Sequence, residues 1–144
     1  VLVTPTCRRR FDKEGKSVNT HGEYPDAIRW VAQKENVPLI ELNGMTTMLC
    51  DVLGVDGSMK LYVHYPAGTF PGQTREFKDN SHFSTYGAYE TAKCVVEGMK
   101  KAKLDIANYL RADYKGFNPA QPDKFETFKW NLCPFTEIEK PDGN

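Results

Sequence analysis

The order of its apolar segments constrains what this chain can fold into more than any other feature. An apolar run at residues 1–5 ends in proline, which is typical of a buried strand that leaves a sheet. A helical pattern follows at 25–35. A second apolar run at 38–42 precedes another helical pattern, for which Asn43 is the expected N-cap and Gly54 the expected end. Strand, helix, strand and helix in such close succession predict a right-handed parallel crossover in an open α/β sheet.

Each predicted helix has one face on which apolar residues recur every three or four positions. We expect the first helix to bury Ile28, Val31 and Ala32, and the second to bury Met45, Met48, Leu49, Val52 and Leu53. The longest helix is predicted from the N-cap Ser84 to about Leu110, with an inner face of Ala88, Ala92, Val95, Val96, Met99, Leu104 and Ile106. Because Cys50 and Cys94 fall on apolar faces, we expect them to be core thiols.

Two segments show no clear periodicity. Residues 55–78 are rich in glycine, proline and aromatic side chains, and we expect an irregular loop, which at this length is usually functional. Residues 115–144 contain four prolines, which predicts an extended tail that wraps the domain or links it to another one. We therefore divide the chain into a domain at 1–112 and a tail or linker at 113–144.

The charge and the cysteines of the chain argue against several classes of protein. Lysine plus arginine equals aspartate plus glutamate at 19 each, so the chain lacks the excess positive charge used to bind nucleic acids or acidic membranes. No apolar run approaches the roughly 20 residues of a membrane-spanning helix. The four cysteines are far apart, which argues against a zinc site, although Cys7 and Cys133 could form a disulfide in an oxidising compartment.

Asp79 and His82 are the residues that point most directly to chemistry. An aspartate three residues before a histidine, on a turn that enters a helix, brings a carboxylate and an imidazole close together. If the carboxylate accepts the Nδ1 proton of the ring, Nε2 is free to take a proton from a hydroxyl, and the imidazolium that forms is stabilised. This is the base and its orienting residue in a serine hydrolase. By itself the four-residue motif is also typical of capping and surface groups.

Four sequence motifs, taken in order, resemble the landmarks of one family. They are VTP with three arginines behind it at 3–10, NTHGEYP at 19–25, PLIELN at 38–43 and DNSHFSTYGA at 79–88. Together they resemble the second half of a GDSL/SGNH hydrolase of the rhamnogalacturonan acetylesterase type. The resemblance covers about residues 1–112, and the order and spacing of the motifs are far more specific than the Asp79–His82 pair alone.

The resemblance implies a fold and an activity. The fold is a flavodoxin-like three-layer α/β/α domain, of which this chain is the C-terminal part with the first strands missing. The activity is that of a carbohydrate esterase, which removes acetyl groups from pectic polysaccharide by a Ser-His-Asp mechanism without metal or cofactor. Asp79 and His82 match the last motif of the family and take the roles of orienting carboxylate and base.

The rest of the family's active site precedes the first strand of this chain. In such enzymes the serine belongs to a Gly-Asp-Ser segment, and a glycine and an asparagine from two later motifs complete the oxyanion hole. We do not expect any of the nearby serines to be the nucleophile. Asp56-Gly57-Ser58 has part of the Gly-Asp-Ser order inverted and lies in the wrong place, between a helix and the long loop. Ser81 is too near His82 in sequence to be aimed easily at its ring, and Ser84 is better explained as a helix cap. We therefore expect a segment of a longer protein that is inactive alone, needs its N-terminal half, and exposes an apolar sheet edge at residues 1–5.

Other candidate residues have ordinary interpretations beside the functional ones. His21 and His64 could join acidic residues at a metal, but they lack ligand spacing, so we predict no metal site. Two interpretations of His64 stay open: it lines a substrate groove beside His82, or it is a loop histidine. The arginines at 8–10 fit a solvated charge run better than a site for galacturonate carboxylates. For the aromatic side chains of the loop, core packing is the usual role and sugar stacking the alternative; these are Tyr62, Tyr65 and Phe70.

Two other functions compete with a pectin acetylesterase. One is a non-catalytic module derived from an esterase, which binds polysaccharide or a partner chain. The other is an SGNH esterase that acts on a different ester. For the parent enzyme, the family resemblance implies an acetylated polysaccharide substrate and an extracellular or periplasmic location, although no signal peptide is present in this chain.

Overall fold

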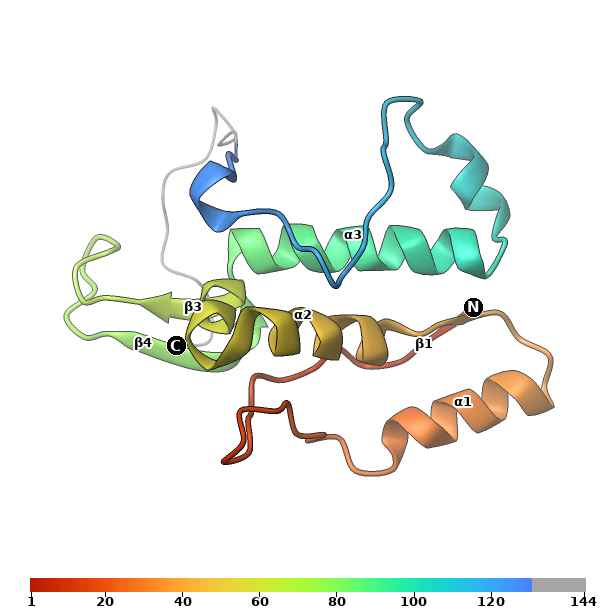
Figure 1. The fold of residues 1–144 in the computed structure, drawn as a ribbon, viewed down its shortest axis with the longest axis horizontal. Helices are drawn as coiled ribbons and strands as arrows, with labels where there is room; N and C mark the ends of the chain where they lie inside the picture. The colour runs from red at the N-terminus through yellow and green to blue at the C-terminus, as the bar shows by residue number, and fades with distance from the viewer. Residues whose placement is uncertain (131–144) are drawn as a thin grey trace.

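The protein is a mixed α/β structure, and the computed structural model describes residues 1–130. In chain order its elements are β1 (Leu2–Val3), α1 (Tyr24–Lys34), β2 (Leu39–Ile40), α2 (Leu42–Gly57), η1 (Ser58–Leu61), β3 (Tyr62–Tyr65), β4 (Phe77–Phe83), α3 (Thr85–Lys101), η2 (Asp105–Tyr109) and η3 (Phe125–Thr127), where η marks a 3₁₀ helix. Figure 1 shows α2 and α3 side by side, with β1 near one end of α2 and the β3–β4 hairpin at the other. Within residues 1–130, no helix is both long and apolar enough to cross a membrane.

The first two strands form the predicted parallel pair. β1 pairs with β2 so that Leu2 faces Leu39 and Val3 faces Ile40, and the amide of Thr4 donates to the carbonyl of Ile40 at 3.1 Å. In the described part of the chain this sheet has two strands. Neither residues 55–78 nor residues 113–130 contribute a further strand to it. Val3 remains 41% exposed.

The segment at 55–78 is not the irregular loop that its composition predicts. The end of α2, η1 and β3 all lie in it, and β3 pairs antiparallel with β4 in a second two-stranded sheet. The aromatic residues explain the difference, because Tyr62 packs on Phe83 at 5.3 Å between ring centroids and favours an extended, paired backbone. Only residues 66–76 lie outside regular elements.

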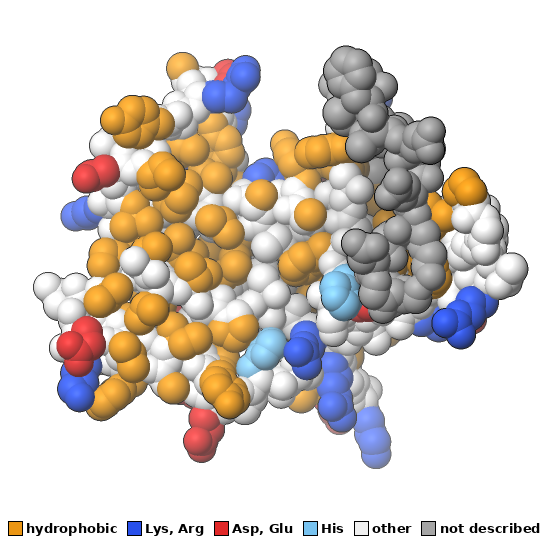
Figure 2. Space-filling view, turned by 180° about the vertical axis from the view of Figure 1, so that it is seen from behind, with side chains coloured by type: hydrophobic (Ala, Val, Ile, Leu, Met, Phe, Trp, Pro, Cys, Tyr) orange, Lys and Arg blue, Asp and Glu red, His pale blue; other side chains and the backbone are white. Residues whose placement is uncertain are grey.

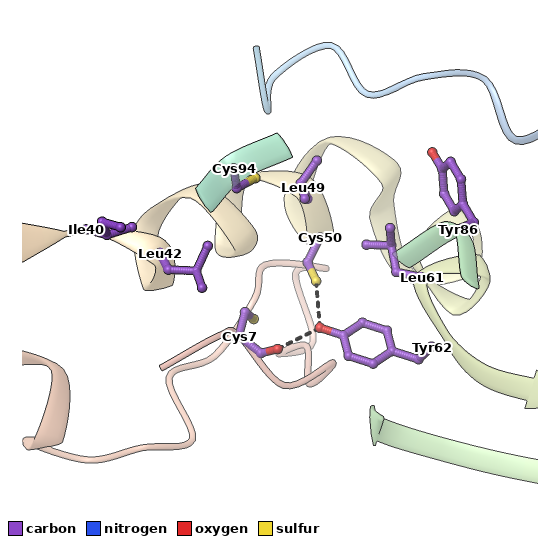
Figure 3. Close-up of a cluster of buried hydrophobic side chains, with 9 residues drawn as sticks. All are labelled: Cys7, Ile40, Leu42, Leu49, Cys50, Leu61, Tyr62, Tyr86 and Cys94. Carbon is purple, nitrogen blue, oxygen red and sulfur yellow. Dashed lines mark hydrogen bonds between the residues drawn. The ribbon is translucent and has the colours of Figure 1, made fainter. Parts of the chain in front are cut away.

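A core of nine buried side chains joins the two sheets to the helices. Its members are Cys7, Ile40, Leu42, Leu49, Cys50, Leu61, Tyr62, Tyr86 and Cys94. The prediction that Cys50 and Cys94 are core thiols is confirmed, since both are fully buried, and burial raises the pKa of the Cys94 thiol to about 12. In Figure 3 the Tyr62 hydroxyl points to Cys7 and Cys50; it donates to the Cys7 carbonyl at 2.7 Å. Cys7 is a buried free thiol, while its candidate partner Cys133 lies outside the described residues.

The caps and buried faces of the first two helices differ in part from the prediction. Ala32 is buried, but Val31 on α1 is 38% exposed, and on α2 the predicted inner residues Met48 and Val52 are exposed as well. Asn43 does not cap α2: its side chain donates to the Pro5 carbonyl, and the Glu41 carboxylate accepts from the Gly44 amide instead. Gly54 interrupts α2 as expected, with φ at +67°, although helical residues resume after this kink.

α3 is shorter than predicted, and its buried face agrees only in part with the predicted one. It ends at Lys101 rather than near Leu110, because Lys103 adopts a left-handed conformation, and Ser84 is its N-cap as predicted. Of the predicted inner residues, Val95, Met99 and Leu104 pack against the core, whereas Ala88, Ala92 and Ile106 are exposed. The buried residues of α3 are Tyr86, Gly87, Glu90, Lys93, Cys94 and Gly98. Glycine explains the difference, since Gly87 and Gly98 let the helix lie directly against Leu61 and Ile40.

The described part of the tail, residues 113–130, packs on α3. Lys93 on the helix pairs with Glu90 at 2.8 Å and with Asp123 at 2.7 Å, and the Tyr86 hydroxyl donates to the Asp123 carbonyl. The rings of Phe125 and Tyr86 pack edge-on, with 5.3 Å between their centroids. The division of the chain at residue 112 stays a prediction.

Candidate active site

Asp79 and His82 lie on a bulge of the β3–β4 hairpin. Tyr62 faces Phe83 and His64 faces Lys78, so only one residue of β3 lies opposite the four residues 79–82 of β4. The prediction placed the pair on a turn entering a helix; it lies instead on this bulged strand, which leads into α3 through Ser84. Bulges release a strand from its ladder and redirect its side chains, and they are common beside active sites.

The Asp79 carboxylate closes the bulge and contacts the His82 ring. Its Oδ1 atom accepts from the backbone amides of Ser81 at 2.6 Å and His82 at 2.8 Å. Its Oδ2 atom lies 2.6 Å from Nδ1 of His82. The Asp79 side chain is 14% exposed and that of His82 is 65% exposed, and within residues 1–130 the only hydrogen-bond partner of the imidazole is Asp79. Nε2 is therefore accessible to a proton donor.

The surroundings of Asp79 keep it ionised. Burial by itself raises the pKa of the carboxyl, but the amides of His82 and Ser81 and the His82 ring outweigh it, so the pKa is lower than usual. A carboxylate that stays charged holds the imidazole in the Nδ1–H form and stabilises the imidazolium.

The depressed pKa of Asp79 predicts a pH dependence of stability. The folded-state pKa lies below the unfolded value of about 3.9, so Asp79 stabilises the fold above that pH, and the contribution is lost as pH falls through the folded pKa. We expect an NMR titration of the Asp79 side-chain carboxyl carbon to give this low value and His82→Ala to raise it only in part, because the two amides remain. A pKa at or above the ordinary aspartate range would contradict the hydrogen-bonded geometry.

Three side chains support the bulge, and of these the sequence did not single out Asn80. Asn80, between Asp79 and His82, accepts from Arg9 at 3.1 Å through Oδ1, and the same atom lies 2.9 Å from Nε2 of His64. His64 therefore lies against the bulge rather than in a separate loop, and Arg9 belongs to this network rather than to a solvated charge run. The one available signal for Arg9 was its place just after the first strand.

Comparison with known proteins finds two curated relatives of this chain. Over 110 residues the chain is 39% identical to rhamnogalacturonan acetylesterase RhgT of Bacillus subtilis, a match that covers 76% of this chain and 47% of the relative. It is 27% identical over 110 residues to the probable rhamnogalacturonan acetylesterase YesY of the same organism, covering 76% and 46% of the two chains. The chain is rhamnogalacturonan acetylesterase-like. No family model matches it, and no solved structure matches it significantly.

The predicted resemblance is thus confirmed, over part of the family's length. This rhamnogalacturonan acetylesterase-like chain spans about half the length of the curated relatives that it matches.

The serines of the rhamnogalacturonan acetylesterase-like chain have structural roles near the site. Ser58 is fully buried, where its hydroxyl accepts from Arg9 at 3.1 Å and donates to the Val55 carbonyl. Ser81 contributes its amide to the bulge, and Ser84 caps α3 by accepting from the Gly87 amide at 3.0 Å. Within the described residues, none of the three hydroxyls forms a hydrogen bond with the His82 ring.

The remaining candidates do not assemble into a second site. Within residues 1–130, no group of three or more His, Cys, Asp and Glu side chains is placed to hold a metal ion. Nε2 of His21 lies 2.8 Å from the carbonyl of Thr6, and Arg8 and Arg10 are exposed. Both roles considered for Tyr62, Tyr65 and Phe70 find some support. Tyr65 packs edge-on against Phe70. Tyr65 also lines a pocket of about 480 Å³, together with Tyr62, His64, Tyr86, Phe125 and Phe128.

Proposed function

We propose that this chain provides the base and the orienting carboxylate of a serine esterase that deacetylates pectic polysaccharide of the rhamnogalacturonan type. The observation that carries the proposal is the 2.6 Å contact between Asp79 Oδ2 and His82 Nδ1, with Nε2 of the exposed ring accessible. The substrate class comes from the relatives, both of which are named as rhamnogalacturonan acetylesterases.

The proposed mechanism uses His82 twice. Its Nε2 atom takes the proton of a serine hydroxyl as the oxygen attacks the acetyl carbonyl, and then gives that proton to the departing sugar oxygen. The same nitrogen next takes a proton from the water that attacks the acetyl-serine, and acetate leaves as the serine recovers its proton. Asp79 stabilises the imidazolium in each half of the reaction.

We place the serine and the oxyanion donors in a part of the domain outside these 144 residues. The curated relatives are about twice the length that the chain covers, which leaves room for such a part. In Figure 2, apolar side chains gather on the reverse face, over the half of the molecule that holds β1 and α1. We propose that the other half of a flavodoxin-like three-layer domain covers this face and extends the β1–β2 sheet.

Three further properties are part of the same proposal. The 144-residue chain alone has no esterase activity, because a base without its nucleophile forms no acyl-enzyme. The complete protein acts outside the cell or in the periplasm, where a cell-wall polysaccharide is encountered. Residues 113–144 form a tail or linker that follows the esterase domain.

The test compares the 144-residue chain with the protein extended by the residues that precede Val1 in its gene. We expect the extended form to release acetate from acetylated rhamnogalacturonan and from a chromogenic acetate ester, and to lose both activities when an organophosphonate modifies one serine. The short chain should do neither. An extended form that hydrolyses neither ester, or that no serine reagent inactivates, would leave a non-catalytic module as the better explanation. Hydrolysis of the chromogenic ester alone would indicate a different natural ester.

A further inference from the structure

The bulge that holds Asp79 and His82 has few backbone bonds to keep its shape. The ladder pairs the hairpin at Lys78 and at Phe83, and residues 79–82 between them are released from it. Asp79 closes the bulge from within, through the amides of Ser81 and His82. Asn80, the residue after Asp79, is held from outside by the side chains of Arg9 and His64, and of these two only Arg9 also reaches the end of α2.

Arg9 contacts the bulge and its support at four points. Its backbone amide donates to the Asn80 carbonyl at 2.9 Å, and its Nη1 donates to Asn80 Oδ1 at 3.1 Å. The same guanidinium donates from Nε to Ser58 Oγ and from Nη2 to the Val55 carbonyl. Its central carbon lies 5.6 Å from the centre of the Phe11 ring. Arg9 therefore ties Asn80 to the buried turn at the end of α2.

We propose that Arg9 is a positioning residue for the Asp79–His82 pair and that it acts through Asn80. Its importance for catalysis rests on the proposed function, whereas its effect on the geometry of the pair does not. Within residues 1–130, Arg9 forms no hydrogen bond with the His82 ring. It holds the bulge in the one conformation in which Asp79 can reach both amides and Nδ1 of His82.

The donors around Asn80 explain why a guanidinium suits this position. Arg9 has only donors, so the oxygen of the Asn80 amide must face it. The same oxygen then accepts from His64, whose Nε2 must carry a proton. The planar fork of Arg9 can reach Asn80, Ser58 and Val55 at once, which the single ammonium of a lysine cannot do in the same geometry.

The first test reads the geometry in the 144-residue chain itself, by ¹⁵N NMR of the imidazole nitrogens. In the natural sequence we expect His82 to be held in the Nδ1–H form by Asp79. In Arg9→Met the ring should shift towards the Nε2–H form that free histidine prefers, and Arg9→Lys should give a smaller shift. Arg10→Met is the matched control, because it removes an equal charge from an exposed neighbour.

Two Asn80 variants separate positioning from general stability. Asn80→Asp keeps an acceptor for Arg9 and His64 and should preserve the His82 form, whereas Asn80→Ala should change it even though its backbone carbonyl still accepts from Arg9. These variants answer the question even if Arg9→Met does not fold. An unchanged His82 spectrum in Asn80→Ala or in folded Arg9→Met, or an equal change in Arg10→Met, overturns the proposal.

The second test measures acetate release by the extended protein. Arg9→Met should lower kcat by about ten- to a hundredfold with KM unchanged, because a misplaced base costs rate rather than substrate binding. Arg10→Met should match the natural sequence. A changed His82 spectrum in a protein without acetate release would reject the proposed function and leave the positioning role standing. Normal kcat in Arg9→Met would reject the positioning role alone.

Discussion

Replacing His82 by alanine in the extended protein is expected to lower kcat for acetate release by about 10⁴-fold or more, the scale of loss when a serine hydrolase loses its base. In the proposed mechanism the His82 ring accepts the serine proton through Nε2, since its Nδ1 faces Asp79 Oδ2 at 2.6 Å. The side chain is 65% exposed, so its removal should leave the free energy of unfolding nearly unchanged. Kinetics of acetate release and urea unfolding together check both expectations.

Asp79→Asn tests the same pair more selectively. The amide oxygen of asparagine can still accept from the amides of Ser81 and His82, so the bulge is retained. The amide nitrogen then faces Nδ1 of His82 and favours the ring form whose Nε2 already carries a proton. We expect a loss in kcat of about 10³- to 10⁴-fold, because that form cannot act as a base.

Two residues outside the bulge supply the matched controls for this pair. Glu76→Gln removes a negative charge from the same hairpin, where Glu76 pairs with Lys78 in solvent, and His21→Ala removes a histidine that lies away from the bulge. Both should retain full activity. Acetate release by His82→Ala or Asp79→Asn within tenfold of the natural sequence would mean that another residue acts as the base.

Replacing Gly87 by alanine is expected to destabilise the fold by about 3 kcal/mol, the upper end of the usual cost of overpacking. A Cβ atom at Gly87 would lie 1.8 Å from the Leu61 carbonyl oxygen and 2.6 Å from its carbon. Both belong to buried backbone, and the same carbonyl accepts from the Ser84 amide at 3.0 Å. The strain can be relieved only by moving α3 from η1, which also displaces the end of β4 behind His82.

Gly44→Ala provides the comparison for this change. Gly44 also lies in a helix, but a Cβ there would meet only the Glu41 side chain at 3.8 Å, an ordinary contact. Alanine is favoured over glycine in helices by up to about 1 kcal/mol, so this variant should be unchanged or slightly more stable. Urea unfolding of both variants by circular dichroism measures the difference. A loss below about 1 kcal/mol in Gly87→Ala would show that α3 and η1 are not in rigid contact.

Short-range patterns predicted much of the fold. The apolar runs that form β1 and β2, the two helices around them and the Ser84 cap each depend on residues within a few positions of one another. The buried faces of the helices were predicted less well, as Met48 and Ala88 show. Periodicity identified part of the buried stripe of α3, including Val95 and Met99, but not Gly87 and Gly98, because close approach of a helix to backbone or to a neighbouring side chain favours small residues over large apolar ones.

The sequence by itself determined that Asp79 and His82 lie close together, because three residues of chain leave them little freedom to separate. Only the tertiary structure decided their setting. The bulge depends on pairing with β3 across the hairpin, and its anchor comes from Arg9, which is 71 residues from Asn80 in the chain. Such contacts leave no periodic signal in the sequence, since they form only when the core brings the end of α2, the loop after β1 and the hairpin together.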